Sequence, residues 1–431
     1  MPKVKSRLGV TLIIIMASLP VFLWKPHAIF GTFSNDLRSI GQILGLVGAT
    51  LFAINFLLSA RLKIMEPFFG GLNRIYILHH ILGGLAFVLL LFHPLTISVS
   101  YMTFSVTSAA QILLPSTNNL PVLYGAISMA LIITLLVITF YVPLMYDIWK
   151  LTHKFLGLAL FFATLHIFFI PSTVSEDPIL RSYMLGLSAL ALAAFCYRTL
   201  FNKFFVRRVL FTVNSVKILP GDITEIIMAP VSKKLNYLPG QFVFIDFASL
   251  GISKETHPFS ITSQPNSELI SVAAKSLGDF TETLKLLKTD TQVRVEGPFG
   301  MFTYTRYGNP NQVWIAGGIG ITPFLSMARS LNSANANQID LYYSVNTPQE
   351  AIYLDELAAK VQAVPNFRVF PFYSKTQGRL SAEMISKATS NVTAKDIFLC
   401  GPPPMMKSLR EQFKKLGLKN YKIHSEEFAI N

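Results

Sequence analysis

The chain has 431 residues, of which 52% are hydrophobic and only 14% are charged. Its mean hydropathy of +0.47 is too high for a single soluble globule of this length. The formal net charge is +14, but the basic residues are scattered rather than grouped with aromatic residues, which excludes a nucleic-acid-binding protein and favours contact with anionic membrane lipid.

The first half of the sequence predicts six membrane-spanning helices. Each is an apolar stretch near the length of about 20 residues that a helix needs to cross a bilayer. The stretches are Leu8–Trp24, Ser39–Ala60, Ile75–Met102, Leu120–Tyr146, Phe155–Pro171 and Tyr183–Phe201. The first one, with its basic prelude, has a signal peptide as its alternative, although a convincing small-residue cleavage site is lacking.

The basic residues predict the orientation of these helices, because Lys and Arg are retained on the cytoplasmic side during insertion. A cytoplasmic N-terminus leaves only Lys25, Arg38 and Arg181 outside. The residues then placed inside are Lys3, Lys5, Arg7, Arg61, Lys63, Arg74, Lys150, Lys154, Arg198, Lys203, Arg207 and Arg208. We therefore expect a multi-pass cell-membrane protein whose N-terminus and C-terminal half are both cytoplasmic.

Four histidines lie in or beside two of the apolar stretches: His79 and His93 in the third, and His153 and His166 at the fifth. A polar ring in hydrocarbon is costly and usually marks a functional site. An interhelical hydrogen bond explains one such residue but not two pairs. A low-spin haem takes one imidazole nitrogen from each side. We therefore predict two b-type haems, with His79 and His153 near the cytoplasm and His93 and His166 near the outside.

The spacing of these histidines supports this assignment in one helix and complicates it in the other. His79 and His93 are 14 residues apart, which is about 21 Å and nearly four turns, so they point the same way at different depths. His80 is therefore given a packing or hydrogen-bonding role. His153 and His166 are 13 apart, and an ideal helix would turn them away from each other by about 140°. A local bulge or kink is required between them.

Basic residues near the two pairs have two interpretations each. Arg74, Lys150 and Lys154 are candidates to pair with the propionates of an inner haem, or are interface anchors. Arg38, the main basic residue near the outer pair, is a candidate catalytic residue that holds a propionate or a developing superoxide. Its alternative is a plain topological or headgroup role.

From Val209 the pattern changes to short strands and turns, which is typical of a small β-barrel that GPFG at 297–300 closes. The segment HPFSIT at 257–262 offers a hydroxyl and flat backbone beside an aromatic ring, which suits flavin recognition, and Ser260 is also a catalytic candidate. A helix begins near Thr281, where free amides attract phosphate; the alternative is an ordinary capped helix. The candidate flavin-binding residues are His257, Pro258, Phe259, Ser260, Ile261, Thr262, Lys275, Gly278 and Thr281.

The next unit begins with a strand, a Gly-rich turn and an amphipathic helix, VWIAGGIGITPFLSMARSL. Its glycines let the backbone approach a pyrophosphate, and the helix start contributes amides. Further alternating strands and helices predict a parallel sheet covered by helices. Cys400, also a candidate catalytic residue, ends a strand where it would lie beside a nicotinamide, or it is merely a buried cysteine. The candidate nucleotide-binding residues are Gly317, Gly318, Ile319, Gly320, Thr322, Pro323, Cys400, Gly401, Pro402 and Pro403.

The chain resembles the ferric reductase and NADPH oxidase superfamily over essentially its full length. The resemblance rests on motifs that occur in the same order: the paired histidines, HPFSI, GDFT, GPFG, GGIGITP and CGPPP. The chain is most similar to compact bacterial NADPH oxidases that lack regulatory extensions. The resemblance implies a six-helix haem-binding bundle at 1–208, followed by a ferredoxin-reductase-like module. That module would comprise an FAD-binding antiparallel β-barrel at 209–308 and an α/β domain for NADPH or NADH at 309–431.

Two details of the resemblance depart from the family pattern. An aromatic residue near the C-terminus commonly covers the flavin, and Phe428 is the candidate here, although residues follow it. Relatives selective for NADPH often place an arginine after the YYS strand, whereas this chain has Val345 and Asn346. Arg379 and Lys375 are alternative partners for a 2′-phosphate, so NADPH and NADH both stay open.

The resemblance implies an electron path from cytosolic NAD(P)H through FAD and two haems to an acceptor on the far side. Dioxygen, reduced to superoxide, is the leading acceptor, and a ferric chelate is the alternative with the same path. A different class also stays open, namely a transporter or proton channel whose soluble half senses nucleotide. The sequence contains no recognisable calcium-binding loop or docking tail, so no obligatory regulatory subunit is expected.

Overall fold

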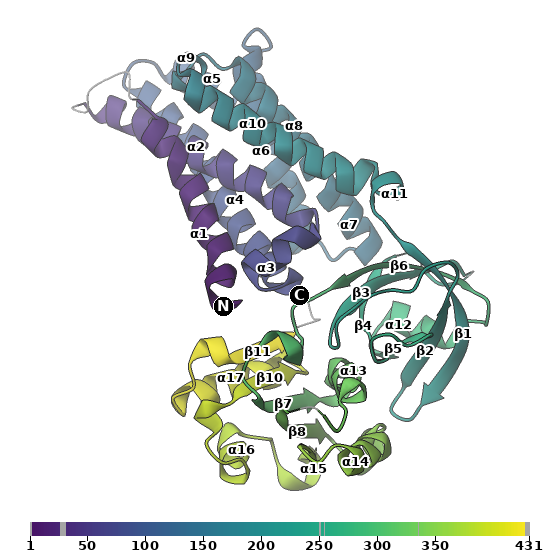
Figure 1. The fold of residues 1–431 in the computed structure, drawn as a ribbon. Helices are drawn as coiled ribbons and strands as arrows, with labels where there is room; N and C mark the ends of the chain where they lie inside the picture. The colour runs from purple at the N-terminus through teal and green to yellow at the C-terminus, as the bar shows by residue number, and fades with distance from the viewer. Residues whose placement is uncertain (1, 26–31, 250, 254, 335, 427–431) are drawn as a thin grey trace. The chain divides into compact units, whose positions relative to one another are not determined.

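The computed structural model describes residues 2–25, 32–249, 251–253, 255–334 and 336–426. The chain divides into two compact units. One contains Val4–Gly70 and Arg74–Val206, and the other contains Arg207–Asn431 with the short segments Met1–Lys3 and Gly71–Asn73. We call the first the helical unit and the second the sheet-containing unit, and Figure 1 shows the elements of each.

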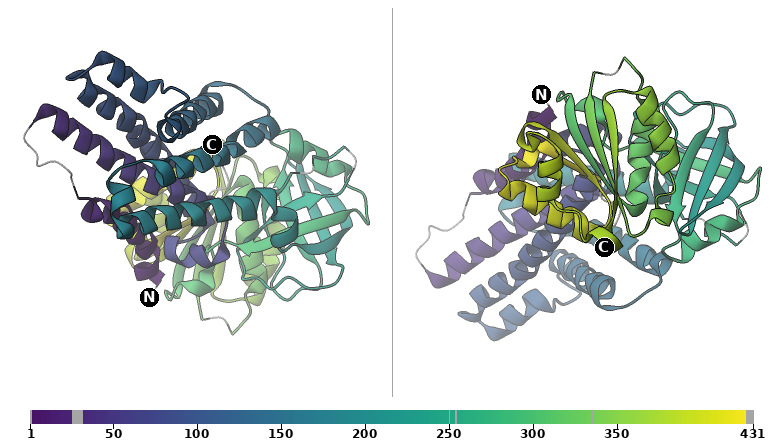
Figure 2. Two further views of the ribbon diagram at one scale, coloured as in Figure 1. Left: turned by 90° about the horizontal axis from the view of Figure 1, so that it is seen from above. Right: turned by 90° about the horizontal axis from the view of Figure 1, so that it is seen from below.

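The helical unit consists of long apolar helices joined by short ones, and the long helices run alongside one another in Figures 1 and 2. The long helices are α1 (Pro2–Leu23), α2 (Phe33–Ser59), α4 (Leu72–Met102), α6 (Leu120–Tyr141), α8 (Leu156–Phe169) and α10 (Pro178–Phe195). The short ones are α3 (Glu66–Phe69), α5 (Val106–Leu113), α7 (Tyr146–Lys154), α9 (Thr173–Glu176) and α11 (Asn202–Phe205), and a π-helical turn at Cys196–Leu200 extends α10.

Five stretches within the described residues are long and apolar enough to cross a membrane. They are Phe33–Ser59, Leu72–Met102, Leu120–Tyr141, Ile148–Phe169 and Pro178–Leu200. A further apolar helix, Leu8–Leu23, is shorter. Large apolar side chains such as Leu85 and Phe161 are exposed on these helices, as lipid-facing residues are. The predicted bundle of apolar helices is confirmed, with a first apolar stretch, Leu8–Leu23, that is shorter than the other five, and the chain is a membrane protein.

The fifth predicted span is interrupted between its two histidines. Helix α7 ends at Lys154 and α8 begins at Leu156. At the junction the N–H of Phe155 donates to the carbonyl of Thr152 over 3.0 Å, a three-residue turn tighter than an α-helix. The irregularity that the 13-residue spacing requires is therefore present, and it lies at Phe155.

The sheet-containing unit begins with a six-stranded antiparallel sheet of order β4-β3-β6-β1-β2-β5. Its elements are β1 (Val209–Leu219), β2 (Ile223–Pro230), β3 (Phe242–Phe247), β4 (His257–Ser260), β5 (Ile270–Lys275), α12 (Asp279–Thr283) and β6 (Gln292–Phe299). Alternate residues of each strand face one side, and those turned inward, such as Phe211, Ile226 and Val243, form the buried core.

A five-stranded parallel sheet of order β11-β10-β7-β8-β9 follows. Its strands are β7 (Asn311–Gly317), β8 (Gln338–Val345), β9 (Phe367–Tyr373), β10 (Asp396–Cys400) and β11 (Ile423–Glu426). Its helices are α13 (Thr322–Ser330), α14 (Leu354–Ala363), α15 (Ser374–Gln377), α16 (Ala382–Ala388) and α17 (Pro403–Lys415). The chain leaves β7 toward β8 on one side and later returns to β10 on the other. The carboxyl ends of β7 and β10 therefore form a topological switch point, where such sheets bind ligands.

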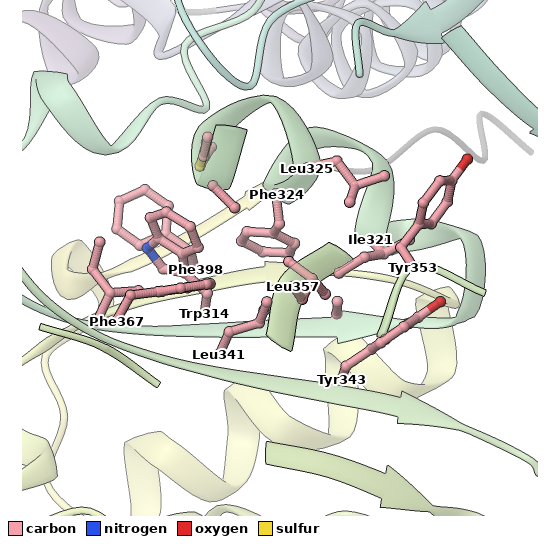
Figure 3. Packing of buried hydrophobic residues seen from close by; sticks show 14 of the residues in the cluster. Trp314, Ile321, Phe324, Leu325, Leu341, Tyr343, Tyr353, Leu357, Phe367 and Phe398 are labelled. Carbon is pink, nitrogen blue, oxygen red and sulfur yellow. The ribbon is translucent and has the colours of Figure 1, made fainter. Parts of the chain in front are cut away.

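Helices cover both faces of this sheet, as parallel sheets require. On one face Trp314, Phe324 of α13 and Leu357 of α14 belong to a single buried cluster (Figure 3). On the other face Ile315 of the same strand packs with residues of α16 and α17, including Phe413. The predicted α/β fold is confirmed, and its packing fixes α13 at the end of the Gly-rich turn.

Candidate redox cofactor sites

The structure brings the four intramembrane histidines together in the two predicted pairs. The ring centroids of His79 and His153 are 6.3 Å apart, and those of His93 and His166 are also 6.3 Å apart. His79 and His93 lie on the continuous helix α4, about 21 Å apart along its axis. The two pairs therefore sit at different depths in the helical unit.

Backbone carbonyls of neighbouring helices hold the rings of the second pair. Nδ1 of His93 lies 2.7 Å from the carbonyl oxygen of Gly41, and Nδ1 of His166 lies 2.8 Å from that of Pro121. A carbonyl oxygen only accepts, so each Nδ1 carries the proton and donates it. This leaves a lone pair on each Nε2, the arrangement that metal-binding histidines use.

In the first pair, only one of the two rings is held by a backbone carbonyl. Nδ1 of His79 donates to the carbonyl of Asn55 over 3.2 Å. Nδ1 of His153 is buried and has no hydrogen-bond partner in the described part of the chain. The His153 ring instead stacks on Trp149, with centroids 5.6 Å apart and an interplanar angle of 15°. The His80 ring lies 5.8 Å from that of His79 on the same helix, outside the facing pair.

These two pairs fit iron held by two axial imidazoles. Two metal–nitrogen bonds of about 2 Å each, plus the distance from each nitrogen to its ring centre, account for a centroid separation of this size. Across the ranges that the structure describes, no group of three or more His, Cys, Asp or Glu side chains forms a metal site. A haem needs only the two axial ligands, since its macrocycle supplies the others.

Two glycines make room for the second pair. A Cβ added at Gly45 would lie 2.6 Å from Nδ1 of His93, and one added at Gly125 would lie 2.9 Å from Nδ1 of His166. Sequence reasoning missed both residues. A signal for one was present, because Gly41 and Gly45 are four apart in a spanning helix, a spacing that allows close helix approach.

The predicted basic residues occupy the ends of the same helices. Arg38 lies on α2 three residues before Gly41, and its guanidinium carbon is 5.9 Å from the centroid of the Tyr101 ring. Arg74 precedes His79 on α4, and Lys154 directly follows His153. Their contact with a propionate or an acceptor stays a prediction.

The structure brings the HPFSI and GDFT segments together beside the six-stranded antiparallel sheet. The ring of His257 stacks on that of Phe280, with centroids 3.7 Å apart and an interplanar angle of 21°. Pro258, Phe259 and Ser260 complete strand β4, and Ser260 and the following Ile261 are buried. Sequence reasoning did not single out Phe280, although it directly follows the Gly-Asp pair.

The turn at Gly278 is a capped helix start. Oγ1 of Thr281 accepts the N–H groups of Leu277 and Gly278 over 2.9 and 3.2 Å and donates to the Gly278 carbonyl. Lys275 ends strand β5 nearby. The geometry is that of the capped-helix alternative, and phosphate binding there stays a prediction.

Thr262, at the end of the predicted flavin segment, is turned into the protein. It is fully buried, and its hydroxyl is 2.7 Å from that of Ser271. Its N–H donates to the Ser271 carbonyl over 2.8 Å. Its own carbonyl accepts from Nη1 of Arg329 over 2.9 Å.

The two glycine motifs of the α/β domain pack directly against each other at the switch point. A Cβ added at Gly320 would lie 2.7 Å from the amide nitrogen of Gly401, and one added at Gly317 would lie 2.8 Å from Cδ of Pro402. Gly318 is required for another reason. Its φ is +55°, which favours glycine, and within the described ranges no atom lies within 4 Å of an added Cβ.

The remaining predicted residues of this site start the two helices. Thr322 begins α13 with Pro323 behind it, and its hydroxyl donates to the carbonyl of Ile319 over 3.0 Å. Pro403 begins α17. Cys400 is the last residue of β10 and is only 2% exposed, so it borders the switch point as a buried residue.

One of the two candidate partners for a 2′-phosphate, Lys375, lies beside the carboxyl end of β8. The N–H of Lys375 donates to the carbonyl of Asn346 over 3.2 Å, and the amide of Asn346 donates to Glu350 over 3.1 Å. Arg379 is exposed nearby in sequence. Phe428, the candidate for covering the flavin, lies outside the described residues.

Three family models match the chain in the order of its domains. The "ferric reductase like transmembrane component" matches residues 44–164, an FAD-binding domain matches 208–303, and an oxidoreductase NAD-binding domain matches 314–411. The chain belongs to the ferric reductase and NADPH oxidase superfamily. It carries an FAD-binding domain and an oxidoreductase NAD-binding domain behind a ferric-reductase-like transmembrane component.

Curated relatives resemble the second half of this superfamily member. The glycine betaine monooxygenase reductase subunit of Chromohalobacter salexigens is 28% identical over 208 residues, which cover 45% of this chain and 56% of that protein. The reductase component of propane 2-monooxygenase from Mycolicibacterium smegmatis is 26% identical over 45% of this chain and 60% of that protein. The chain thus spans little more than half the length of these relatives.

Solved structures also match this half. The FAD/NAD-binding domain of nitric oxide dioxygenase from Vibrio cholerae is 22% identical, with a TM-score of 0.45, over 51% of this chain and 98% of that chain. A ferredoxin NADP+ reductase from Neisseria gonorrhoeae, with bound FAD and NADP, is 19% identical, with a TM-score of 0.44, over the same shares.

Proposed function

We propose that this protein carries electrons from cytosolic NAD(P)H through FAD and two b-type haems to dioxygen on the outer face of the membrane, producing superoxide. The observation that supports the proposal most is the pair of facing histidines at each of two depths, with ring centroids 6.3 Å apart. Both pairs involve the segment that matches a ferric-reductase-like transmembrane component.

The chain's own residues hold and orient the groups rather than react. His79, His153, His93 and His166 would bind the irons through Nε2, because carbonyls hold Nδ1 of three of them. The glycine turn at the switch point would admit the pyrophosphate of the nucleotide. When bound, the nicotinamide gives up a hydride to the flavin, and the irons carry its two electrons singly.

The visible spectrum of the purified protein, produced with ample haem, tests the electron path. We expect a Soret band that sharpens with dithionite, about two haems per chain, and one FAD. A colourless membrane unit would overturn the proposal and favour a transporter or proton channel with a nucleotide-sensing domain.

The acceptor needs a separate assay. With NADPH or NADH as donor, we expect reduction of cytochrome c that superoxide dismutase suppresses. Robust reduction of a ferric chelate without any dismutase-sensitive component would contradict superoxide production and favour a ferric-chelate reductase with the same electron path.

A further inference from the structure

One helix of the nucleotide domain is bonded to the end of the predicted flavin segment. The hydroxyl of Ser326 on α13 donates to the carbonyl of Ser263 over 2.6 Å, and Nη1 of Arg329 donates to the carbonyl of Thr262 over 2.9 Å. Thr262 and Ser263 follow directly on HPFSI. The same helix begins where the Gly-rich turn ends, so it borders both predicted cofactor sites.

The spacing along α13 explains how it does this. Thr322, Ser326 and Arg329 are separated by four and then three residues, which places them on one face of the helix. The rise from the first to the last is about 10 Å. Helix α13 therefore extends from the turn that would hold the pyrophosphate to the strand end that would hold the flavin.

Arg329 is itself fixed in place by α14. Its Nε and Nη2 bond to the two carboxylate oxygens of Glu356 over 2.6 and 2.8 Å. Burial alone would lower the pKa of Arg329, but the hydrogen bond and charge of Glu356 outweigh it, so the pKa is raised. This bidentate pairing holds the planar guanidinium in one orientation, which aims Nη1 at Thr262.

The flavin side of the contact is equally constrained. The hydroxyl of Tyr237 donates to the carbonyl of Gln264 over 2.6 Å and lies 2.9 Å from the hydroxyl of Ser263. The hydroxyls of Thr262 and Ser271 are 2.7 Å apart. Because the segment after β4 is bonded on both sides, a displacement of α13 cannot be absorbed by that segment alone.

We propose that Ser326, Arg329 and Glu356 form a brace that sets the distance between the nicotinamide and the flavin, with Arg329 as its positioning residue. This inference rests on the proposed function, because it concerns the hydride step of that function. The brace touches neither reacting atom. It acts through Thr262 and Ser263, and it predicts a loss of hydride-transfer rate without a matching loss of either cofactor.

The test is anaerobic stopped-flow reduction of the bound flavin in the full-length holoprotein at increasing NADPH. For Arg329→Gln and for Ser326→Ala we expect the limiting rate to fall about tenfold to a hundredfold, since small misplacements cost that much. The FAD content and the apparent Kd for NADPH should change less than twofold. A deuterium label on the transferred hydrogen should show a larger isotope effect, and Arg329→Lys, which keeps the charge without the fork, should recover part of the rate.

Arg368→Gln is the matched control. Arg368 makes a similar pair with Asp340, from Nε over 2.7 Å, but it lies near the amino end of β9, away from the carboxyl-end site. The Arg368→Gln variant should therefore reduce its flavin at the same limiting rate as the wild type.

Flavin reduction within twofold of wild type in both brace variants overturns the inference, as does a rate that falls only in proportion to lost FAD. If Arg329→Gln does not fold, Ser326→Ala decides by the same criteria. A wild-type protein whose flavin neither NADPH nor NADH reduces overturns the proposed function, and the brace with it.

Discussion

At the residue scale, the position of the histidine rings in the helical unit depends on two glycines that leave room for them. A methyl group at Gly45 would lie 2.6 Å from Nδ1 of His93, closer than packed atoms tolerate. It would displace the ring from the Gly41 carbonyl, which holds it at 2.7 Å. The same argument applies to Gly125 and His166.

We predict that Gly45→Ala weakens haem retention at the second pair, because changes to groups that orient a ligand cost about tenfold to a hundredfold in metal affinity. The haem content per chain, measured after purification, should fall toward half. Gly84→Ala is the control, since no atom of the described residues lies within 4 Å of its added Cβ. Equal haem loss in both variants would contradict the prediction.

The adjacent histidines of α4 offer a second comparison. His79→Ala should remove one haem and sharply reduce the Soret absorbance, because its ring faces His153 at 6.3 Å. His80→Ala should keep both haems, since it lies beside the pair rather than in it. Pyridine haemochrome analysis measures the difference. A greater loss from His80→Ala would reverse the ligand assignment.

The sequence predicted which histidines face each other, because helix direction and residue spacing settle that. It did not predict the carbonyls that hold Nδ1 or the roles of Gly45 and Gly125. These depend on which turn of a neighbouring helix lies opposite. Arg329 was missed for the same reason: its contact with Thr262 joins residues 67 apart in sequence, and no local pattern reports it.

At the scale of elements, the spacing of the histidines predicted that the fifth helix is irregular but did not predict that the break lies at Phe155. The separation of 13 residues from His153 to His166 required an irregular helix, but Phe155, where the helix breaks, is neither a proline nor a glycine. The location therefore came only from the structure. The strand-turn-helix unit around Gly317 was predictable in full, because a strand, a Gly-rich turn and a helix each carry their own local signal.

That turn gives the third prediction. Gly320→Ala would push a methyl group against the backbone of Cys400 and Gly401, at a cost of about 1 to 3 kcal/mol. It would also shift the amides at the start of α13. Loss of one hydrogen bond to the nucleotide, about 1.4 kcal/mol, weakens NADPH binding about tenfold.

Titration of flavin reduction against NADPH measures this change, and thermal unfolding measures the destabilisation. Gly308→Ala is the control, because its added Cβ meets no atom of the described chain within 4 Å. Unchanged NADPH affinity in a destabilised Gly320→Ala protein would separate stability from binding and contradict a nucleotide role for this turn.

At the scale of the whole molecule, the sheet-containing unit has its own hydrophobic cores. Clusters around Phe211, Trp314 and Phe413 are each built from residues after Arg207. A segment with its own cores is expected to fold alone. We predict that residues 207–431 give a soluble protein that binds FAD and reduces a soluble dye with NADPH or NADH. Size-exclusion chromatography and the flavin spectrum measure this, and an insoluble or flavin-free product would contradict it.

The orientation of the chain is the last whole-molecule prediction, and it depends on charge alone. Twelve basic residues against three favour a cytoplasmic N-terminus, which places the loop containing Ser116 outside and the unit containing Ser333 inside. Both serines are exposed. A membrane-impermeant maleimide applied to intact cells should label Ser116→Cys but not Ser333→Cys, and permeabilised cells should label both. Native Cys400 is buried and Cys196 is partly buried, so the unsubstituted chain gives the background. Labelling of Ser333→Cys in intact cells would reverse the orientation and place NAD(P)H oxidation on the wrong side of the membrane.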